Sequence, residues 1–376
     1  MNLSLVLLKF LIFINTFDQQ IQKTPKITIM KNLLLFVTSL FLLISCKQNQ
    51  EKTIRENYLD FSKRNDQWTG GIKMIPIKTP IGNFRVWTKT VGNNPTIKVL
   101  LLHGGPGLTH ECFESFDGYF PQESIEYIYY DQLGSYYSDQ PNDNKLWTNE
   151  RFVEEVEQVR LALGLNKDNF YLLGQSWGGI LAMEYALKYQ KNLKGLIISN
   201  MMASAPEYNK YAQEVLGPKM DPTILKQVMD IEKNNDFKNP KYSELLFKYY
   251  YTEHILRKPQ SEWPESVNRA FKHLNPNVYV FMQGESEFGI TGKATLKNWD
   301  VKDRLKTLTI PTLSIGAKFD TMDPEHMKWI SKEVQNGRFL YCPTGSHLSQ
   351  YDDQKDYFPG IIKFLKDVNS NNFKKD

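Results

Sequence analysis

Six short apolar runs, each ending in a glycine or a polar loop, constrain the fold of this chain most strongly. The runs are continuous rather than alternating, which is typical of strands buried on both faces of a parallel sheet. Segments with helical spacing lie between several of them, which indicates βαβ units. The sequence therefore predicts an α/β fold with a mostly parallel central sheet. The six runs are IKVLLLHGG, IEYIYYDQLG, NFYLLGQ, LKGLIISN, IPTLSIGAKFD and RFLYCPTGSH.

Two other segments have clear local patterns. Residues 70–92 alternate apolar and polar side chains around a Pro-Ile-Gly turn, so we expect a β-hairpin there. In residues 148–165, apolar side chains recur at helical spacing. Thr148 is the expected N-cap of this helix and Gly164 its stop signal.

A helical insertion is expected to interrupt the sheet. With 376 residues, 41% of them hydrophobic, the chain can bury a large core. Between Asn200 and Trp299 the strand signal disappears and amphipathic helical patterns rich in Lys, Glu and Tyr follow, which predicts a lid over the strand ends. The expected divisions are a signal segment at 1–45, a linker at 46–69, the first part of the core at 70–204, a helical cap at 205–299, the second part of the core at 300–368 and a polar tail at 369–376.

The N-terminal region predicts export and lipid attachment. From Met30, the sequence MKNLLLFVTSLFLLISCKQNQ has a lysine and then an apolar run of roughly 13 residues, the layout of a cleavable signal. This run is too short to span a bilayer comfortably. Its ending, Leu43 to Cys46, resembles a bacterial lipobox, which implies a lipoprotein anchored through Cys46 and facing the periplasm or the cell exterior. An ordinary secretory signal or signal anchor is the alternative.

Residues 1–29 fit no part of a normal signal. We therefore expect translation to begin at Met30, with a paired membrane segment as the alternative. Most of the formal net charge of +4 comes from residues 1–45, which hold four lysines against one aspartate. The rest of the chain is nearly neutral, so a nucleic-acid partner is not indicated.

The cysteines give no sign of a metal site. If Cys46 is lipidated, only Cys112 and Cys342 remain, and their surroundings lack metal-ligand spacing. Two interpretations stay open for this pair: two buried thiols, or one disulfide in an oxidising compartment. The sequence implies no metal and no organic cofactor.

The motif YLLGQSWGG, residues 171–179, predicts a serine nucleophile at Ser176. It fits Gly-x-Ser-x-Gly directly after a predicted strand and before a helix, the context of a nucleophile elbow. A serine hydroxyl needs a histidine base oriented by a carboxylate, and here the acid and the histidine should follow the serine along the chain. His347 lies just beyond the last predicted strand, whereas His254 and His273 lie in the insertion. His347 is therefore the expected base.

Two aspartates follow the strand before that histidine. Asp323 precedes Pro324 at a predicted helix start, where it has a sufficient role as an N-cap. Asp320 stands directly at the strand end and has no such role. We therefore assign Asp320 as the acid and treat His326 as an ordinary helical residue.

The glycine-rich stretch LLLHGGPGLTH, residues 100–110, predicts an oxyanion hole. It follows an earlier strand, so a backbone amide there would face the serine. The amides of Gly105 and Trp177 are the expected donors to the oxyanion that forms when a serine attacks a carbonyl. His103 is expected to be a structural hydrogen-bonding residue rather than a second base.

Four motifs, HGGPG, DQLGSYYSDQP, GQSWGG and GAKFDTMDP, resemble in this order the proline iminopeptidases, or prolyl aminopeptidases, of the α/β-hydrolase fold. The resemblance runs from about Gly70 to Leu365 and includes the insertion, where VYVFMQGESEFGITGKATLKNWD is similar to the family's cap segment. It implies an α/β-hydrolase core with a helical cap. It also implies release of an N-terminal residue, often proline, with acidic residues binding the free amine.

The sequence departs from this family where the amine would bind. One family glutamate lies in a Gly-Pro-Asn-Glu-Phe context and matches Glu287, but Glu285 and Ser286 replace the Pro and Asn. A second family glutamate often follows the catalytic aspartate, where this chain has Thr321. Two interpretations of Glu285 stay open: it supplies the missing carboxylate through charge-assisted hydrogen bonds, or it is solvated on the lid.

The leading functional prediction is a serine exopeptidase that acts on short peptides through an acyl-enzyme. An amidase or esterase acting on small amides, amino-acid esters or lactones is the alternative, favoured by the loss of the second glutamate. A surface-tethered, non-catalytic ligand-binding protein is the alternative of a different class, and the serine, acid and histidine argue against it. The sequence does not indicate an oligomeric state.

Overall fold

The computed structural model describes residues 55, 57–62 and 69–376. Residues 58–376 form one compact unit. The predicted signal segment, Cys46 and most of the predicted linker lie outside the described residues, so the expectations for them stay predictions, as do the cap boundaries at 205 and 299. No helix in the described part of the chain is long and apolar enough to cross a membrane.

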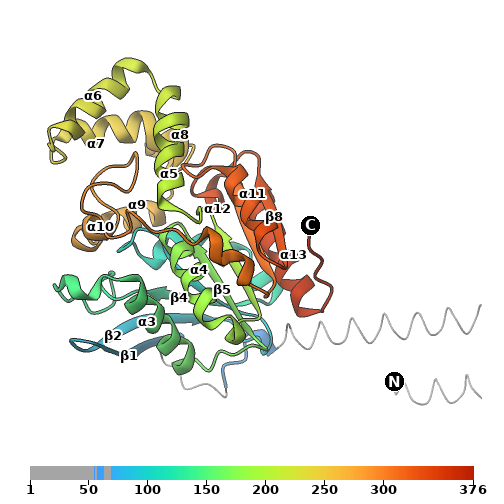
Figure 1. Ribbon diagram of the computed structural model, residues 1–376. Helices are drawn as coiled ribbons and strands as arrows, with labels where there is room; N and C mark the ends of the chain where they lie inside the picture. The colour runs from blue at the N-terminus through green and yellow to red at the C-terminus, as the bar shows by residue number, and fades with distance from the viewer. Residues whose placement is uncertain (1–54, 56, 63–68) are drawn as a thin grey trace, which may run out of the picture. The chain divides into compact units, whose positions relative to one another are not determined.

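An eight-stranded sheet forms the centre of the molecule, with the strand order β1-β2-β4-β3-β5-β6-β7-β8 (Figure 1). All neighbours from β4 to β8 pair in parallel, and the hairpin of β1 and β2 joins antiparallel to β4. The predicted hairpin, the six predicted strands and the mostly parallel sheet are confirmed. The strands are β1 Ile72–Thr79, β2 Gly82–Val91, β3 Lys98–Leu102, β4 Glu126–Asp131, β5 Phe170–Gln175, β6 Gly195–Ser199, β7 Thr312–Ala317 and β8 Gly337–Cys342.

Helices cover both faces of this sheet, which is why the inner strands are apolar without alternation. In β3, Leu100 and Leu102 belong to one hydrophobic cluster and Val99 and Leu101 to the other. The first cluster includes residues of α3 (Asn149–Ala162), α4 (Trp177–Tyr189) and α11 (Pro324–Glu333). The second includes residues of the 3-10 helix η1 (His110–Gly118) and of α13 (Gln354–Asn369). The edge strands β1 and β8 and the first half of β2 are partly exposed.

The residues that were predicted to begin or end helices do so in the structure. The Thr148 side chain accepts a hydrogen bond from the Arg151 amide at 3.3 Å, and Gly164 follows the end of α3 with φ +66°. Asp323 caps α11 by accepting from the Glu325 amide at 3.0 Å.

The segment between β6 and β7 is helical and lies beyond the carboxyl ends of the strands (Figure 1). Its two ends meet where the Ser204 hydroxyl donates to Asp300 Oδ2 at 2.7 Å. One small hydrophobic cluster lies within the segment, and a second joins it to Leu348, in the loop after β8. The helices are α5 (Ala205–Tyr211), α6 (Pro222–Lys233), α7 (Pro240–Leu246), α8 (Thr252–His254), α9 (Glu265–Lys272) and α10 (Pro276–Met282).

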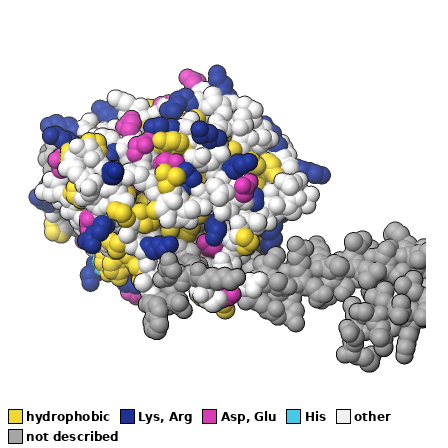
Figure 2. Space-filling model, turned by 90° about the horizontal axis from the view of Figure 1, so that it is seen from below, with side chains coloured by type: hydrophobic (Ala, Val, Ile, Leu, Met, Phe, Trp, Pro, Cys, Tyr) yellow, Lys and Arg dark blue, Asp and Glu magenta, His cyan; other side chains and the backbone are white. Residues whose placement is uncertain are grey.

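Figure 2 shows the molecule from below the view of Figure 1, with basic and acidic side chains interspersed over the visible face. The carboxyl ends of the strands, under the helical segment, are the place where an open α/β sheet presents its functional side chains.

Candidate active site

Ser176 lies in a strained turn between β5 and α4. Its backbone has φ +57° and ψ −126°, a conformation that non-glycine residues rarely adopt and that is found at functional sites. The turn requires glycine on both sides. A Cβ on Gly174 would lie 1.9 Å from the Gly178 carbonyl oxygen, and a Cβ on Gly178 would lie 1.9 Å from the Leu102 carbonyl oxygen. The Gly-x-Ser-x-Gly pattern therefore has a steric cause in this fold.

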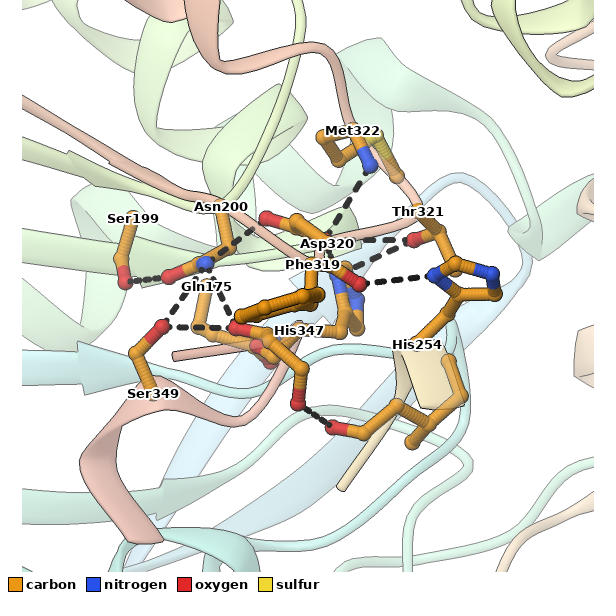
Figure 3. A network of polar contacts seen from close by, with 12 residues as sticks. Gln175, Ser199, Asn200, His254, Phe319, Asp320, Thr321, Met322, His347 and Ser349 are labelled. Carbon is orange, nitrogen blue, oxygen red and sulfur yellow. Dashed lines mark hydrogen bonds and ion pairs between the residues drawn. The ribbon is translucent and has the colours of Figure 1, made fainter. Parts of the chain in front are cut away.

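Asp320 and His347 form a buried pair (Figure 3). Asp320 Oδ1 lies 2.7 Å from His347 Nδ1, and the Asp320 side chain is fully buried. The Met322 amide donates to the same carboxylate oxygen at 3.1 Å. When the neutral imidazole donates its Nδ1 proton to a carboxylate, Nε2 carries no proton and is able to accept one.

Asn200 holds the other oxygen of this carboxylate, and sequence reasoning missed it. Its Nδ2 donates to Asp320 Oδ2 at 2.7 Å, and its backbone φ is +53° (Figure 3). Asn200 follows β6 directly, and β6 is the neighbour of the strand that ends before Asp320. A polar residue at the carboxyl end of an adjacent parallel strand was the signal that could have found it.

The glycine-rich loop after β3 lies against the serine turn. A Cβ on Gly104 would lie 3.0 Å from Cβ of Ser176. Trp177, the first residue of α4, is fixed by its ring Nε1, which donates to Gln132 Oε1 at 2.8 Å. The same Gln132 donates through Nε2 to the His103 carbonyl at 3.1 Å, so one side chain ties the loop to the serine turn.

His103 makes hydrogen bonds through both ring nitrogens. Its Nδ1 lies 2.9 Å from the Gly104 carbonyl, and its Nε2 accepts from the Gln132 amide at 3.1 Å. These partners require the neutral ring with a proton on Nδ1. Burial lowers the pKa of His103 to about 4, opposed in part by the nearby Asp131 carboxylate. Both ring nitrogens are hydrogen-bonded, which agrees with the structural role expected for His103.

One cavity of about 200 Å³ brings most of the expected site residues together. Ser176 and His347 line it, and so do Gly105, Trp177 and Glu287. Apolar and aromatic side chains supply most of the remaining wall, mainly from the helical segment. A mostly apolar cavity with a few converging polar groups is the usual form of a small-molecule or peptide-end site.

Glu287 is the acidic residue in the wall of this cavity. The Tyr279 hydroxyl donates to Glu287 Oε1 at 2.9 Å, and Tyr251 also donates to the carboxylate. Burial raises the pKa of Glu287, and the two tyrosine hydrogen bonds oppose that rise. The nearby Glu232 carboxylate adds to the rise. A nearby cation stabilises the ionised form of a desolvated carboxylate, so this position favours a positively charged ligand group.

Glu285 does not reach this cavity. Its side chain is exposed, and it is not among the lining residues. The structure therefore favours the interpretation in which Glu285 is solvated on the lid. The acid that does lie beside Glu287 is Glu232 of α6, which the sequence analysis did not single out.

Comparison with known proteins places this arrangement in a family. A family model described as the α/β-hydrolase fold matches residues 98–354. A proline iminopeptidase of Flavobacterium johnsoniae is 62% identical over 296 residues, covering 79% of this chain and 98% of that protein. One of Elizabethkingia meningoseptica is 61% identical over 300 residues, covering 80% of this chain and all of that protein. This chain belongs to the proline iminopeptidase family of α/β-hydrolases.

The solved structures agree with that membership. A proline iminopeptidase of Mycobacterium smegmatis matches with a TM-score of 0.71 at 25% identity, covering 80% of this chain and 99% of the other. The expected α/β-hydrolase fold is thereby confirmed.

Thr321 occupies the position at which the proline iminopeptidase family often has a second glutamate. Its hydroxyl lies 3.3 Å from Asp320 Oδ1 and 3.3 Å from His347 Nδ1 (Figure 3). Thr321 also lines the cavity. It adds a polar contact to the pair of Asp320 and His347 but no negative charge.

Backbone hydrogen bonds join the helical segment to the loop that carries His347. The His347 amide donates to the His254 carbonyl at 3.0 Å, and the next amide, of Leu348, donates to the Ile255 carbonyl at 2.9 Å. The His254 ring turns away, with Nδ1 2.8 Å from the Phe319 carbonyl (Figure 3). Movement of this segment would therefore act directly on the position of His347.

His326 and the two described cysteines have structural surroundings. His326 Nε2 accepts from the Ala203 amide at 3.1 Å, and burial lowers the pKa of His326 to about 4. Cys112 and Cys342 are free and buried, and burial raises the pKa of both thiols. Among the residues that the structure describes, no group of three or more His, Cys, Asp or Glu side chains is placed to hold a metal ion.

Proposed function

We propose that this protein is a serine exopeptidase that releases an N-terminal residue, proline preferred, from short peptides. The observation that carries the proposal is the cavity in which a serine at a strained turn, a histidine paired with a buried aspartate and a desolvated glutamate meet. Relatives more than 60% identical carry the name proline iminopeptidase, which supports proline as the released residue.

The chemistry follows from these positions. Ser176 Oγ attacks the carbonyl carbon of the first residue while His347 Nε2 takes its proton. Asp320 holds the imidazole by Nδ1 and stabilises its positive charge, and Asn200 fixes Asp320 from behind. The backbone amides of Gly105 and Trp177 stabilise the oxyanion. His347 then gives the proton to the leaving amine, and water attacks the acyl-enzyme through the same base.

Glu287 selects the free N-terminus. A partly buried carboxylate that is held by tyrosine hydroxyls has lost part of its hydration, so an ammonium group gives it a favourable partner. A blocked amine offers no charge and leaves the carboxylate unpaired, which costs binding energy. Glu287 and Ser176 line the same cavity of about 200 Å³, so a substrate held by its free amine would present its first carbonyl to the serine, and release would occur one residue at a time.

An amidase or esterase of small substrates is the second candidate, and the absence of a carboxylate at Thr321 favours it. Turnover of a proline arylamide and of a simple aryl ester separates the two functions. The exopeptidase should prefer the arylamide with a free amine and lose that preference in Glu287→Gln. Equal use of the ester by the wild type and Glu287→Gln, with little arylamide turnover, would favour the esterase.

We further propose that the protein is exported and anchored by lipid on Cys46. The support is the apolar run and lipobox-like sequence that end at this cysteine. A bacterium expressing the full chain with an alkyne-bearing palmitate should yield labelled protein in the membrane fraction, and Cys46→Ser should abolish both label and membrane association. Unlabelled wild-type protein would contradict the anchor, and peptides from residues 1–29 would contradict a start at Met30.

A further inference from the structure

A second carboxylate lies behind Glu287, on the far side of the loop that carries it. Glu232, near the end of α6, accepts from the Ser286 hydroxyl at 3.0 Å through Oε1 and at 2.9 Å through Oε2. The Tyr242 hydroxyl donates to Glu232 Oε1 at 2.7 Å. Three parts of the helical segment, α6, α7 and the 284–289 loop, therefore meet at one carboxylate.

The loop that carries Glu287 is shaped by the same contacts. The Ser286 hydroxyl also accepts from the Phe288 amide at 3.1 Å, which closes a local turn around Glu287. Ser286 itself is buried. The carboxylate of Glu232 thus fixes the residue immediately before Glu287, and Phe288 follows it into a hydrophobic cluster shared with Tyr242.

Two negative charges lie on this side of the cavity, and both attract an ammonium. Glu287 lines the cavity and would contact the amine directly, whereas Glu232 lies outside the lining residues. Its carboxylate is partly exposed, and it acts on Glu287 through the loop and through its charge. The other titratable groups that face Glu287 include Tyr279, Tyr251, Tyr242, the hydroxyls of Tyr208 and Tyr250, and His347.

We propose that Glu232 is a positioning residue of the amine site, which holds Glu287 through Ser286 and supplies the second negative charge in place of Glu285. This inference rests on the proposed exopeptidase function. It also accounts for a departure from the family pattern, because the Ser286 hydroxyl donates to the Glu232 carboxylate.

Three single variants test the proposal with a proline arylamide as substrate and prolinol as a competitive inhibitor. Prolinol carries the amine but no scissile bond, so its binding does not require the acyl transfer. Glu232→Gln keeps the side-chain shape and removes the charge. Ser286→Ala removes the hydroxyl and keeps both carboxylates, and Glu285→Gln removes an exposed charge from the same loop as the matched control.

Glu232→Gln should raise KM for the arylamide and Ki for prolinol about three- to tenfold at a pH where both carboxylates are ionised, with kcat nearly unchanged. It should also shift the acid limb of prolinol binding to lower pH, because Glu287 would ionise more easily without a neighbouring charge. Ser286→Ala should raise KM and leave that limb in place. Glu285→Gln should change neither.

Identical kinetics and pH profiles for Glu232→Gln and Glu285→Gln would overturn the proposal. A fall in kcat of Glu232→Gln that is equal for amine substrates and aryl esters would also overturn it, because that result marks general loosening of the fold. If Glu232→Gln does not fold, Ser286→Ala decides: an unchanged KM would refute the link through Ser286. Failure of the wild type to cleave the arylamide would instead refute the proposed function itself.

Discussion

Replacing Gly178 by alanine tests whether the serine turn is as tightly packed as the structure indicates. The new Cβ would lie 1.9 Å from the Leu102 carbonyl oxygen, about 1.5 Å inside an ordinary contact, and its neighbour is backbone at the end of a buried strand. A shift of α4 or of β3 would disrupt the packing of the core, so we expect a loss of about 3 kcal/mol or more in the free energy of unfolding. Because α4 begins at Trp177, any shift of the helix also displaces the expected oxyanion donor.

Thermal unfolding followed by fluorescence is the assay, with Gly118→Ala as the matched control. A Cβ on Gly118 meets no atom within 4 Å, and that glycine is exposed. Gly178→Ala should lower Tm by about 5–10 °C and abolish most turnover, whereas Gly118→Ala should leave both nearly unchanged. If the two variants melt together with the wild type, the steric account of the Gly-x-Ser-x-Gly turn is wrong.

Three further predictions concern the catalytic groups. Asp320→Asn should lower kcat about 10⁴-fold with little change in Tm, as measured by arylamide turnover, because the imidazole loses its orienting acceptor. Asn200→Ala should remove a hydrogen bond to a buried carboxylate worth about 1.5–3 kcal/mol, and it should lower both Tm and kcat. Since burial raises the pKa of Glu287, prolinol binding should weaken as the pH falls while still above the ordinary carboxyl range, and Glu287→Gln should bind prolinol weakly without this pH dependence.

Much of the fold could be predicted because its signals are local. The continuous apolar runs of the inner strands report burial on both faces, and the cap at Thr148 and the cap at Asp323 each depend on residues within three positions. Ser176, Asp320 and His347 could be chosen because each stands at the carboxyl end of a predicted strand or in the loop after it. Parallel strands bring these ends to one edge of the sheet.

The surroundings of Glu287 were predicted only in part: family resemblance pointed to Glu287, but nothing in the sequence pointed to Glu232. Glu232 lies on an amphipathic helix and has no local feature that separates it from the solvated acids around it. Its partner, Ser286, is 54 residues away, and only the packing of α6 and α7 over the loop brings them together. Glu285 adjoins Ser286 in sequence, but its side chain is exposed. Side-chain direction in an irregular loop is set by tertiary contacts, which a local pattern does not carry.

The most direct test of the account compares L-proline arylamide with N-acetyl-L-proline arylamide, using purified wild-type protein and Ser176→Ala. The account predicts that the wild type cleaves the free-amine substrate, that it leaves the acetylated one essentially intact, and that Ser176→Ala cleaves neither while melting near the wild-type temperature. Equal cleavage of both substrates, or substantial turnover by Ser176→Ala, would contradict it.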